Sequence, residues 1–243
     1  MRVFVTGGAS GLGRALVEAC ALRGDEVAYG DLNPPTDSIP GTYLKLDIRD
    51  PDDWAAVHEW VVSNWGGLDL LINNAGVAGG GRIDVASMEE WEQIFSVNLF
   101  GVVRGVREFV PMMKAQRSGH IVNVASLAGL VHPAGMASYN AVKAAVVALT
   151  ETLGHELDEW GIKASAVCPS YFRTNLLNSS PPGADRALGM VIGRMVDRSP
   201  FGPADIAAAV LAGVERGDDV ILPDAAAQGA VDLKRSISWP TTR

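Results

Sequence analysis

The sequence predicts an α/β protein with one doubly wound parallel sheet and helices packed on both of its faces. Three observations predict this fold class. Short runs rich in β-branched residues alternate along the chain with helical segments, which is the order found in parallel sheets. The runs are apolar almost throughout, as expected for strands that are covered on both faces. A glycine-rich turn follows the first run and opens the first helix.

Seven strands and five helices account for most of the chain. The strands are predicted at residues 2–6, 26–31, 42–47, 68–74, 120–126, 162–168 and 219–223, and the helices at 11–23, 51–65, 88–116, 136–159 and 203–216. The second helix begins at Pro51 with Asp52 and Asp53 in its first turn, where proline fits and acidic groups interact favourably with the helix dipole. The strands are expected to form one seven-stranded sheet in a single domain, 1–243.

Two segments outside this pattern need a separate interpretation. The longest region without a clear strand lies at about 171–200 and is rich in proline and glycine. Long connections of this kind are usually functional or disordered, and the scattered Leu177, Met190, Ile192 and Met195 favour a lid over a substrate site. The last residues, at about 224–243, are expected to form a C-terminal tail.

The composition excludes several classes of protein. The net charge of -8, from 20 basic and 28 acidic residues, opposes binding to nucleic acid or to an anionic membrane surface. No apolar run is long enough to span a membrane, and the apolar start of the chain is too short for a signal peptide. Cys20, Cys168 and the four histidines show no metal-ligand spacing, so no metal site is predicted. A reduced, cytoplasmic protein fits these features best.

The turn after the first strand predicts a dinucleotide phosphate site. Gly7, Gly11 and Gly13 let the backbone turn sharply and approach a pyrophosphate, and the free amides at the start of the next helix attract anions. Ser10 and Leu12 lie between these glycines and are further candidate cofactor contacts. The alternative interpretation is a tight turn without a ligand.

The second strand ends in Asp31, 18 residues after Gly13. A carboxylate near this offset accepts hydrogen bonds from the ribose hydroxyls of NAD. Leu32 follows, so no arginine at that position offers a site for the 2′-phosphate of NADP, and NAD is the predicted cofactor. The alternative is a solvated carboxylate at a strand end.

Tyr139 and Lys143 lie four residues apart in the predicted helix 136–159, so both project from one face. Such pairs are common on helix surfaces. Here the residues around Lys143 are apolar on every side, which predicts a helix that is buried on more than one face. Because a buried ammonium group needs a partner, we expect the two side chains to converge on a ligand.

Three motifs resemble those of one family. The opening TGGASGLG, the tetrapeptide NNAG at 73–76 and the Tyr-x-x-x-Lys pair resemble the short, single-domain branch of the short-chain dehydrogenase/reductase family, over roughly residues 1–222. The resemblance implies a Rossmann fold that holds NAD(P) at the carboxyl ends of its strands. It also implies that Ser, Tyr and Lys act on a secondary alcohol or a ketone.

The resemblance assigns roles to further positions. It implies a catalytic serine at Ser126 and a supporting asparagine at Asn98. It places Asp47 and Ile48 beside the adenine. Contacts near the adenosine ribose and the nicotinamide amide are implied for Asn74, Ala75, Gly76, Pro169 and Thr174.

Tyr139 is the predicted general acid/base. A free phenol has a pKa of about 10, so on the order of one in a thousand is ionised at neutral pH. An ammonium group at ~4 Å, with an effective dielectric constant of ~20, favours the phenolate by about 4 kcal/mol, or roughly three pKa units, before desolvation is subtracted. We therefore expect Lys143 to lower the pKa of Tyr139 while Ser126 hydrogen-bonds the substrate oxygen. By the resemblance, Lys143 also binds the nicotinamide ribose and Asn98 holds a water that relays the proton.

The chain departs from the family pattern at two places. Ser170 stands where a glycine is usual, which puts the backbone angle there in question. The C-terminus lacks the usual strand followed by Asp-Gly-Gly, which argues against a reductase of the fatty-acid-synthesis type.

Three function classes follow from these residues. An NAD-dependent alcohol dehydrogenase or ketone reductase has all its chemical groups present. A non-catalytic NAD-binding regulatory or scaffold protein is the alternative, although such relatives typically lose the tyrosine or the lysine. An epimerase or dehydratase of nucleotide sugars would need a larger C-terminal domain.

The expected substrate is a small-molecule alcohol or carbonyl compound, neutral or moderately apolar. Its pocket is predicted to form from residues 77–81, Leu127, Ala128, 130–136 and the lid, which are mostly apolar. By the resemblance and by its apolarity, helix 136–159, with its neighbour at 99–116, predicts assembly into a homodimer or homotetramer.

Overall fold

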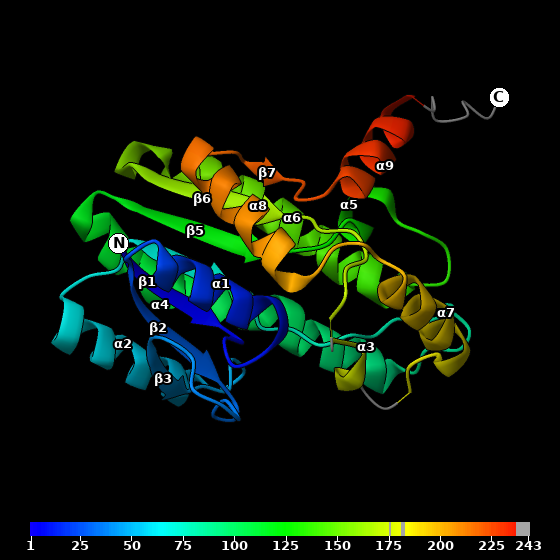
Figure 1. Ribbon diagram of the computed structural model, residues 1–243, viewed down its shortest axis with the longest axis horizontal. Helices are drawn as coiled ribbons and strands as arrows, with labels where there is room; N and C mark the ends of the chain where they lie inside the picture. The colour runs from blue at the N-terminus through cyan, green and yellow to red at the C-terminus, as the bar shows by residue number, and fades with distance from the viewer. Residues whose placement is uncertain (175, 181–182, 237–243) are drawn as a thin grey trace.

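The computed structural model describes residues 1–174, 176–180 and 183–236, which form one seven-stranded sheet with helices around it (Figure 1). The order in the sheet is β3-β2-β1-β4-β5-β6-β7, and every neighbouring pair is parallel. The predicted fold class is confirmed, and each strand lies within two residues of its expected bounds. The strands are β1 (Arg2–Thr6), β2 (Glu26–Asp31), β3 (Thr42–Lys45), β4 (Leu70–Asn73), β5 (Gly119–Val124), β6 (Ile162–Val167) and β7 (Val220–Ile221).

The predicted helices at 11–23, 51–65, 136–159 and 203–216 are present with small changes at their ends. Sequence patterns did not predict three helices: the short α5, the lid helix α7 and the C-terminal α9. Residues 237–243 of the expected tail lie outside the described residues. The helices are α1 (Gly11–Leu22), α2 (Pro51–Trp65), α3 (Met88–Phe95), α4 (Val102–Gln116), α5 (Ala128–Val131), α6 (Ala137–Leu157), α7 (Arg186–Asp197), α8 (Pro203–Arg216) and α9 (Ala225–Ser236).

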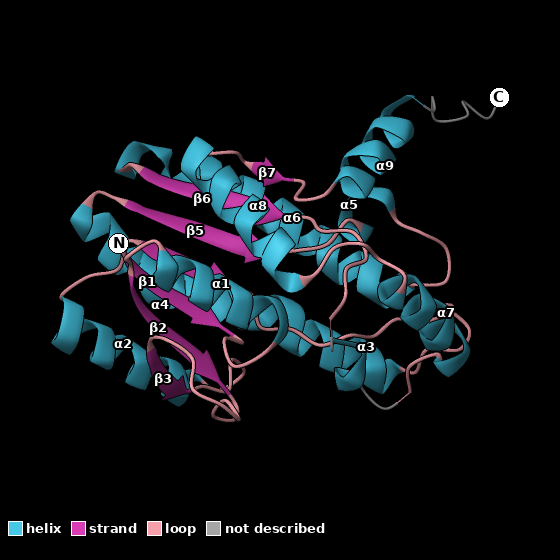
Figure 2. Ribbon diagram, in the orientation of Figure 1, coloured by secondary structure: helices cyan, strands magenta, loops and turns pink. Residues whose placement is uncertain are grey.

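Helices cover the sheet in two layers (Figure 2). One core cluster joins Val3 and Val5 of β1 to α1 and α8, for example to Leu16 and Val210. A second cluster joins the opposite side of β1, at Phe4, to side chains of α2, α4 and α6. Strands that are apolar on both sides need this double cover, which explains why their sequences do not alternate.

The prediction of one continuous helix over 88–116 is wrong, because this range contains two α-helices. A π-helical segment, η1 (Ser96–Gly101), separates α3 from α4. Within it Asn98 is 1% exposed, and its side-chain amide pairs with the backbone of Val77: the Val77 N–H donates to Oδ1 at 2.8 Å and Nδ2 donates to the Val77 carbonyl at 3.0 Å. The widened turn thus brings a helix side chain to the loop after β4, and such bulges are frequent near functional sites.

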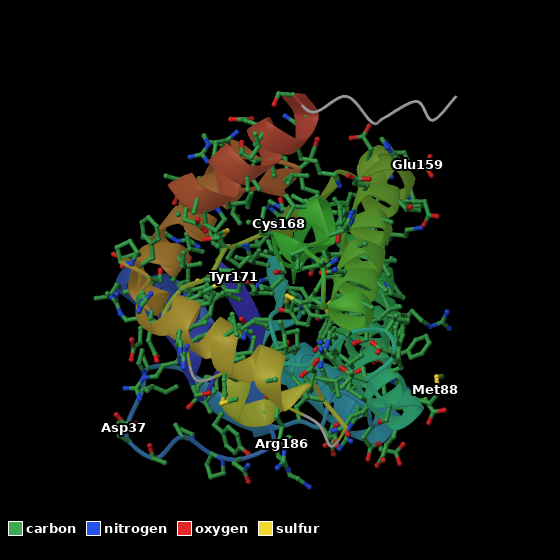
Figure 3. All side chains as sticks on the ribbon, turned by 90° about the vertical axis from the view of Figure 1, so that its right-hand side faces the viewer. Asp37, Met88, Glu159, Cys168, Tyr171 and Arg186 are labelled. Atoms are coloured by element: carbon green, nitrogen blue, oxygen red, sulfur yellow. The ribbon has the colours of Figure 1, made fainter. Side chains whose placement is uncertain are left out.

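The strand order places a crevice at one edge of the sheet. The chain runs outward from β1 to β2 and β3 and then returns to β4 on the other side of β1. The loops that leave β1 and β4 therefore diverge at the carboxyl ends of the strands, where open α/β sheets bind their ligands. Figure 3 looks toward this edge, with α7 crossing in front of the strands and Tyr171 beside it. No helix among the described residues is long and apolar enough to cross a membrane.

Candidate active site

A cavity of about 550 Å³ opens at the carboxyl ends of the strands. It is lined by the turn between β1 and α1, by the loops after β2 to β6, by α6 and by the lid. Gly13 and Asn98 are not part of the lining, but the other predicted site residues are. Those lining residues are Gly7, Ser10, Gly11, Leu12, Asp31, Leu32, Asp47, Ile48, Asn74, Ala75, Gly76, Ser126, Tyr139, Lys143, Pro169 and Thr174.

The glycine turn has the shape of a phosphate cradle. The amides of Gly7 and Gly8 both donate to the Gly30 carbonyl, at 2.7 and 3.3 Å, which fixes the turn against β2. Gly7 has φ +67, in the left-handed region that favours glycine. At Gly13 an added Cβ would lie 2.0 Å from the Gly7 carbonyl oxygen, so only glycine lets α1 begin this close to the turn. The first turn of α1 lines the cavity, and its free amides suit an anionic pyrophosphate.

The side chain of Asn74 hydrogen-bonds the backbone where β1 leads into this turn. Its Nδ2 donates to the Thr6 carbonyl at 3.0 Å, while the Thr6 hydroxyl accepts from the backbone amides of Asn74 and Ala75 at 3.0 and 2.9 Å. The NNAG motif thus joins β4 to the end of β1 by its side chain and its backbone. Because Asn74 holds the turn, it contributes to the shape of the cradle before any ligand is bound.

Asp31 stands at the end of β2 beside the turn. Its Oδ2 accepts a hydrogen bond from the Ala9 amide at 3.1 Å, and it lines the cavity. Leu32, which follows, is 54% exposed. The guanidinium of Arg14 is paired with Glu18 and Asp37, so it is already neutralised by two carboxylates. The residues at this end therefore fit a dinucleotide with free ribose hydroxyls.

Asp47 lies farther along the same end of the cavity. Both of its oxygens accept from the Arg49 guanidinium, which holds the pKa of Asp47 below its usual range. The backbone amide of Arg49 also donates to it at 2.9 Å. Ile48 is buried against Gly101, where an added Cβ would lie 2.4 Å from its Cδ1. An adenine amino group that approached Asp47 would share its oxygens with Arg49.

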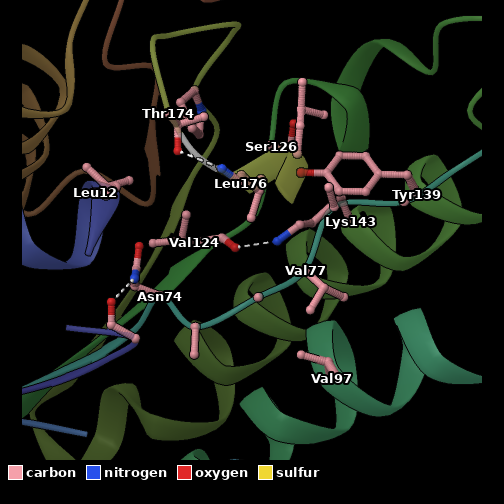
Figure 4. A pocket seen from close by; sticks show the side chains of 18 of the residues that line it. Leu12, Asn74, Val77, Val97, Val124, Ser126, Tyr139, Lys143, Thr174 and Leu176 are labelled. Carbon is pink, nitrogen blue, oxygen red and sulfur yellow. Dashed lines mark hydrogen bonds between the residues drawn. The ribbon is translucent and has the colours of Figure 1, made fainter. Parts of the chain in front are cut away.

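Tyr139, Lys143 and Ser126 meet at the centre of the cavity (Figure 4). The phenol of Tyr139 points toward the Ser126 hydroxyl, and that hydroxyl accepts from the Ala128 amide at 3.2 Å. Lys143 is 6% exposed, and its Nζ donates to the Val124 carbonyl at 2.9 Å. The structure therefore brings these three side chains to one part of the cavity, with Ser126 contributed by the loop two residues beyond β5. Their convergence on a ligand stays a prediction.

The prediction that Lys143 lowers the pKa of Tyr139 is wrong when only the protein's own groups act on the phenol. Burial raises the pKa of Tyr139 to about 12, although its hydrogen bond with Ser126 acts to lower it. Burial lowers the pKa of Lys143 to about 8. The amine lies 5.8 Å from the centre of the tyrosine ring and points to a carbonyl, so its attraction for a phenolate is weaker than desolvation. Tyr139 is therefore protonated at neutral pH and can act directly as an acid.

Asn98 does not face the cavity. Its side-chain oxygen and nitrogen are both used by the backbone of Val77, as described above. The side chain thus shapes the loop 77–81 that borders the substrate end. A role of Asn98 in proton relay stays a prediction.

The loop after β6 carries the Ser170 departure. Among the described non-glycine residues only Arg117 and His132 have positive φ, so Ser170 occupies its position without backbone strain. Its amide and hydroxyl donate to Asp224, at 2.9 and 2.5 Å. Asp224 is 6% exposed and also accepts from the Ala227 amide in the first turn of α9. The serine thus links this loop to the C-terminal helix, a contact that sequence reasoning missed because Asp224 lies 54 residues away.

The opposite end of the cavity is apolar. Met136, Ile192 and Val196 form a buried cluster, with Tyr139, Leu177 and Leu188 packed against it. Of the apolar residues expected to make the lid, Leu177 and Ile192 face inward, whereas Met190 and Met195 are 66% and 48% exposed. Among the described residues the charged side chains of the lining are Asp31, Asp47, Arg49 and Lys143, and none of these belongs to the lid.

Comparison with known proteins agrees with these motifs. Residues 1–185 match the family model described as short chain dehydrogenase. The chain is 34% identical over 185 residues to 3-alpha-(or 20-beta)-hydroxysteroid dehydrogenase of Mycobacterium tuberculosis (strain CDC 1551 / Oshkosh), covering 73% of this chain and 71% of the relative. It is 34% identical over 191 residues to 3-oxoacyl-acyl-carrier-protein reductase FabG of Thermotoga maritima, covering 74% and 78%.

Solved structures share the whole fold. The crystal structure of a short chain dehydrogenase/reductase from Burkholderia phymatum in complex with NAD superimposes with a TM-score of 0.86. It is 29% identical in sequence, and the match covers 100% of this chain and 98% of that one.

We predict that Gly13→Ala weakens NAD binding at least tenfold, because the new methyl group must displace the Gly7 carbonyl from the phosphate turn. The matched control is Gly229→Ala in α9, where an added Cβ meets nothing within 4 Å. Titration calorimetry with NAD measures both variants, and thermal melting checks that each is folded. An unchanged dissociation constant for a folded Gly13→Ala would contradict the cradle.

Proposed function

The chain belongs to the short-chain dehydrogenase/reductase family, and we propose that it transfers a hydride between NAD(H) and a secondary alcohol or ketone, with Tyr139 as general acid/base. One observation carries this proposal. The Tyr139 phenol points at the Ser126 hydroxyl within an apolar cavity, and Lys143 of the same helix is anchored beside it. The non-catalytic alternative is not supported, because all three groups are present and the relatives are named as dehydrogenases and reductases.

Each residue has a distinct task in this proposal. Ser126 hydrogen-bonds the substrate oxygen and holds it near Tyr139. In ketone reduction Tyr139, which is protonated at neutral pH, donates its proton to that oxygen. In alcohol oxidation it must accept the proton, so the phenolate needs further positive charge or hydrogen bonds. Lys143 is anchored beside Tyr139, where it hydrogen-bonds the nicotinamide ribose of the bound cofactor in this proposal. Bound NAD(H) supplies the hydride donor or acceptor.

NAD is proposed over NADP on the strength of Asp31. A carboxylate at the ribose accepts hydrogen bonds from two hydroxyls but repels a 2′-phosphate. Leu32 offers that phosphate no donor, and Arg14 is already paired with two carboxylates.

The proposed substrate is neutral and bulky, with a largely apolar body. Its half of the cavity is lined by Met136, Ile192 and Val196 and has no cation apart from Lys143 among the described lining residues. A substrate carboxylate or phosphate would find no ion pair there. One relative is named as a hydroxysteroid dehydrogenase, and a rigid apolar alcohol of that kind suits the lining. We also propose that residues 171–200 act as the lid of a single dinucleotide-binding domain.

A cytoplasmic location remains part of the proposal. Cys20 and Cys168 are both free and buried, which agrees with a reducing environment.

Tyr139→Phe is expected to lower kcat at least 100-fold with NAD affinity almost unchanged, since proton transfer typically contributes a factor of about 10² to 10⁴. The measurement is a screen of bulky secondary alcohols with NAD and with NADP, followed by kinetics of the best substrate. Tyr171→Phe is the matched control, because Tyr171 also lines the cavity, and the one hydrogen bond of its hydroxyl among the described residues goes to the Met136 sulfur, at 3.9 Å. Equal turnover by Tyr139→Phe and the wild type would refute the proposed base.

Asp31→Asn is expected to reduce the preference for NAD over NADP at least tenfold, because it removes the charge that repels a 2′-phosphate and keeps an oxygen for the Ala9 amide. The ratio of kcat/KM for the two cofactors measures the change. Asp232→Asn, an equal change of charge on the exposed side of α9, should leave that ratio unaltered. A wild-type enzyme that prefers NADP would remove the role given to Asp31.

We further propose a homodimer or homotetramer that assembles through α6 and the neighbouring helix. On α6, Ala148 is exposed and Leu149 is half-buried, and Phe100 of η1, which leads into α4, is 51% exposed, so an apolar surface is available there. Light scattering at micromolar protein should give two or four times the 25.6 kDa of one chain. The mass of a single chain at that concentration would contradict this assembly.

A further inference from the structure

Glu90 is the most deeply buried charged side chain among the described residues, with 0% of its surface exposed. It lies in the first turn of α3 and does not line the cavity. The proposed reaction gives it no task. Burying a carboxyl group is unfavourable unless donors meet it, so its contacts identify what it does.

Two donors from different segments meet one of its oxygens. Oε1 accepts from the Gly80 amide at 2.7 Å and from the Ser138 hydroxyl at 2.9 Å. Ser138 is itself 0% exposed and immediately precedes Tyr139. The other oxygen, Oε2, is buried without a hydrogen-bond partner among the described residues. One oxygen of Glu90 therefore joins the loop after β4 to the first turn of α6.

The first turn of α6 depends on this contact. Its N-cap residue, Met136, makes no side-chain capping hydrogen bond. A second contact to this turn also comes from the loop after β4: the Ala137 amide donates to the Gly81 carbonyl at 3.1 Å. Gly79 is also fitted to the carboxylate, since an added Cβ would lie 2.7 Å from Oε1. The start of the helix that bears Tyr139 is thus placed by the loop 79–81 and by Glu90.

The lid is attached to the same loop. The Asp185 amide donates to the Gly80 carbonyl at 3.2 Å, and the Arg82 guanidinium pairs with the Asp185 carboxylate at 2.9 Å. Asp185 in turn caps α7 by accepting from the amides of Ala187 and Leu188. Segments 79–82 and 137–139 therefore meet at the buried Glu90 carboxylate. The start of the lid helix, 185–188, is attached to the first of these two segments.

We propose that Glu90 is a positioning residue, which holds the loop 79–82 and the first turn of α6 together so that Tyr139 faces the substrate oxygen. This inference rests on the proposed function of Tyr139. Reacting groups must be held closely, because a displacement of about 1 Å can lower the rate on the order of 100-fold. Since no donor from the described part of the chain meets Oε2, an amide nitrogen can occupy its place, and glutamine can keep both hydrogen bonds to the remaining oxygen.

The test compares Glu90→Ala, Glu90→Gln and Glu89→Ala in the full-length protein. Glu90→Ala is expected to lower kcat at least tenfold for the best alcohol found in the screen, with the dissociation constant of NAD within twofold of wild type. Glu90→Gln should restore kcat to within threefold. Glu89→Ala removes the same side chain from an exposed position one residue earlier and should change neither. A kcat within twofold of wild type for Glu90→Ala, or no rescue by glutamine, would overturn the proposal.

A second measurement does not depend on turnover. Amide hydrogen exchange in peptides covering 77–82 and 136–142 should speed up at least threefold in Glu90→Ala and stay unchanged in Glu90→Gln. If the alanine variant does not fold, Ser138→Ala removes one of the two donors and should lower kcat and speed up exchange in 136–142 in the same direction. Unchanged exchange in both segments would overturn the positioning role.

The two proposals fail in different ways. If the wild type oxidises no secondary alcohol and reduces no ketone, the proposed function fails, while the exchange experiment still decides whether Glu90 joins the two segments. If the wild type is active and Glu90→Ala is equally active, only the positioning role fails.

Discussion

The hydrogen bond from Lys143 to the Val124 carbonyl is the contact on which the rest of the site depends. An ammonium group that is 6% exposed needs an acceptor, and the end of β5 provides one. The bond fixes α6 against the sheet at that point. Since Ser126 follows Val124 by two residues and Tyr139 precedes Lys143 by one helical turn, the same contact sets the phenol against the serine hydroxyl. The lysine is thus a structural anchor as well as a charge.

This anchor changes how the acidity of Tyr139 should be understood. From the sequence alone the lysine is expected to be a free charge near the ring. In the fold its amine points at the Val124 carbonyl, and both the amine and the phenol lose contact with solvent. Desolvation then exceeds the attraction between the two groups. The tyrosine therefore carries its proton at neutral pH, and its use as a base depends on what else enters the cavity. Within the protein, Lys143 therefore positions Tyr139 and does not lower its pKa.

The sequence was sufficient for features that are encoded locally. Strand and helix patterns gave the whole sheet, and Pro51 and Pro203 both mark true helix starts. The turn between β1 and α1 was also predictable, because its glycines are required by its own backbone. The roles of Glu90 and Asp224 were not predictable, since each carboxylate joins its own region to a partner 48 or more residues away. The π-helical turn at Asn98 likewise depends on the distant backbone of Val77.

The same distinction separates the two ends of the cavity. The nucleotide end is built from backbone amides, glycines and one strand-end carboxylate, which a short motif specifies and which can bind only a narrow class of ligand. The substrate end is built from apolar side chains of the lid and of the loop before α6, such as Ile192 and Met136. Apolar contacts are non-directional and favour any ligand of suitable size. The choice of substrate therefore depends on the contacts that hold these apolar side chains in place. The loop 79–82 is central to those contacts, because it is bonded to Glu90 and also to the lid.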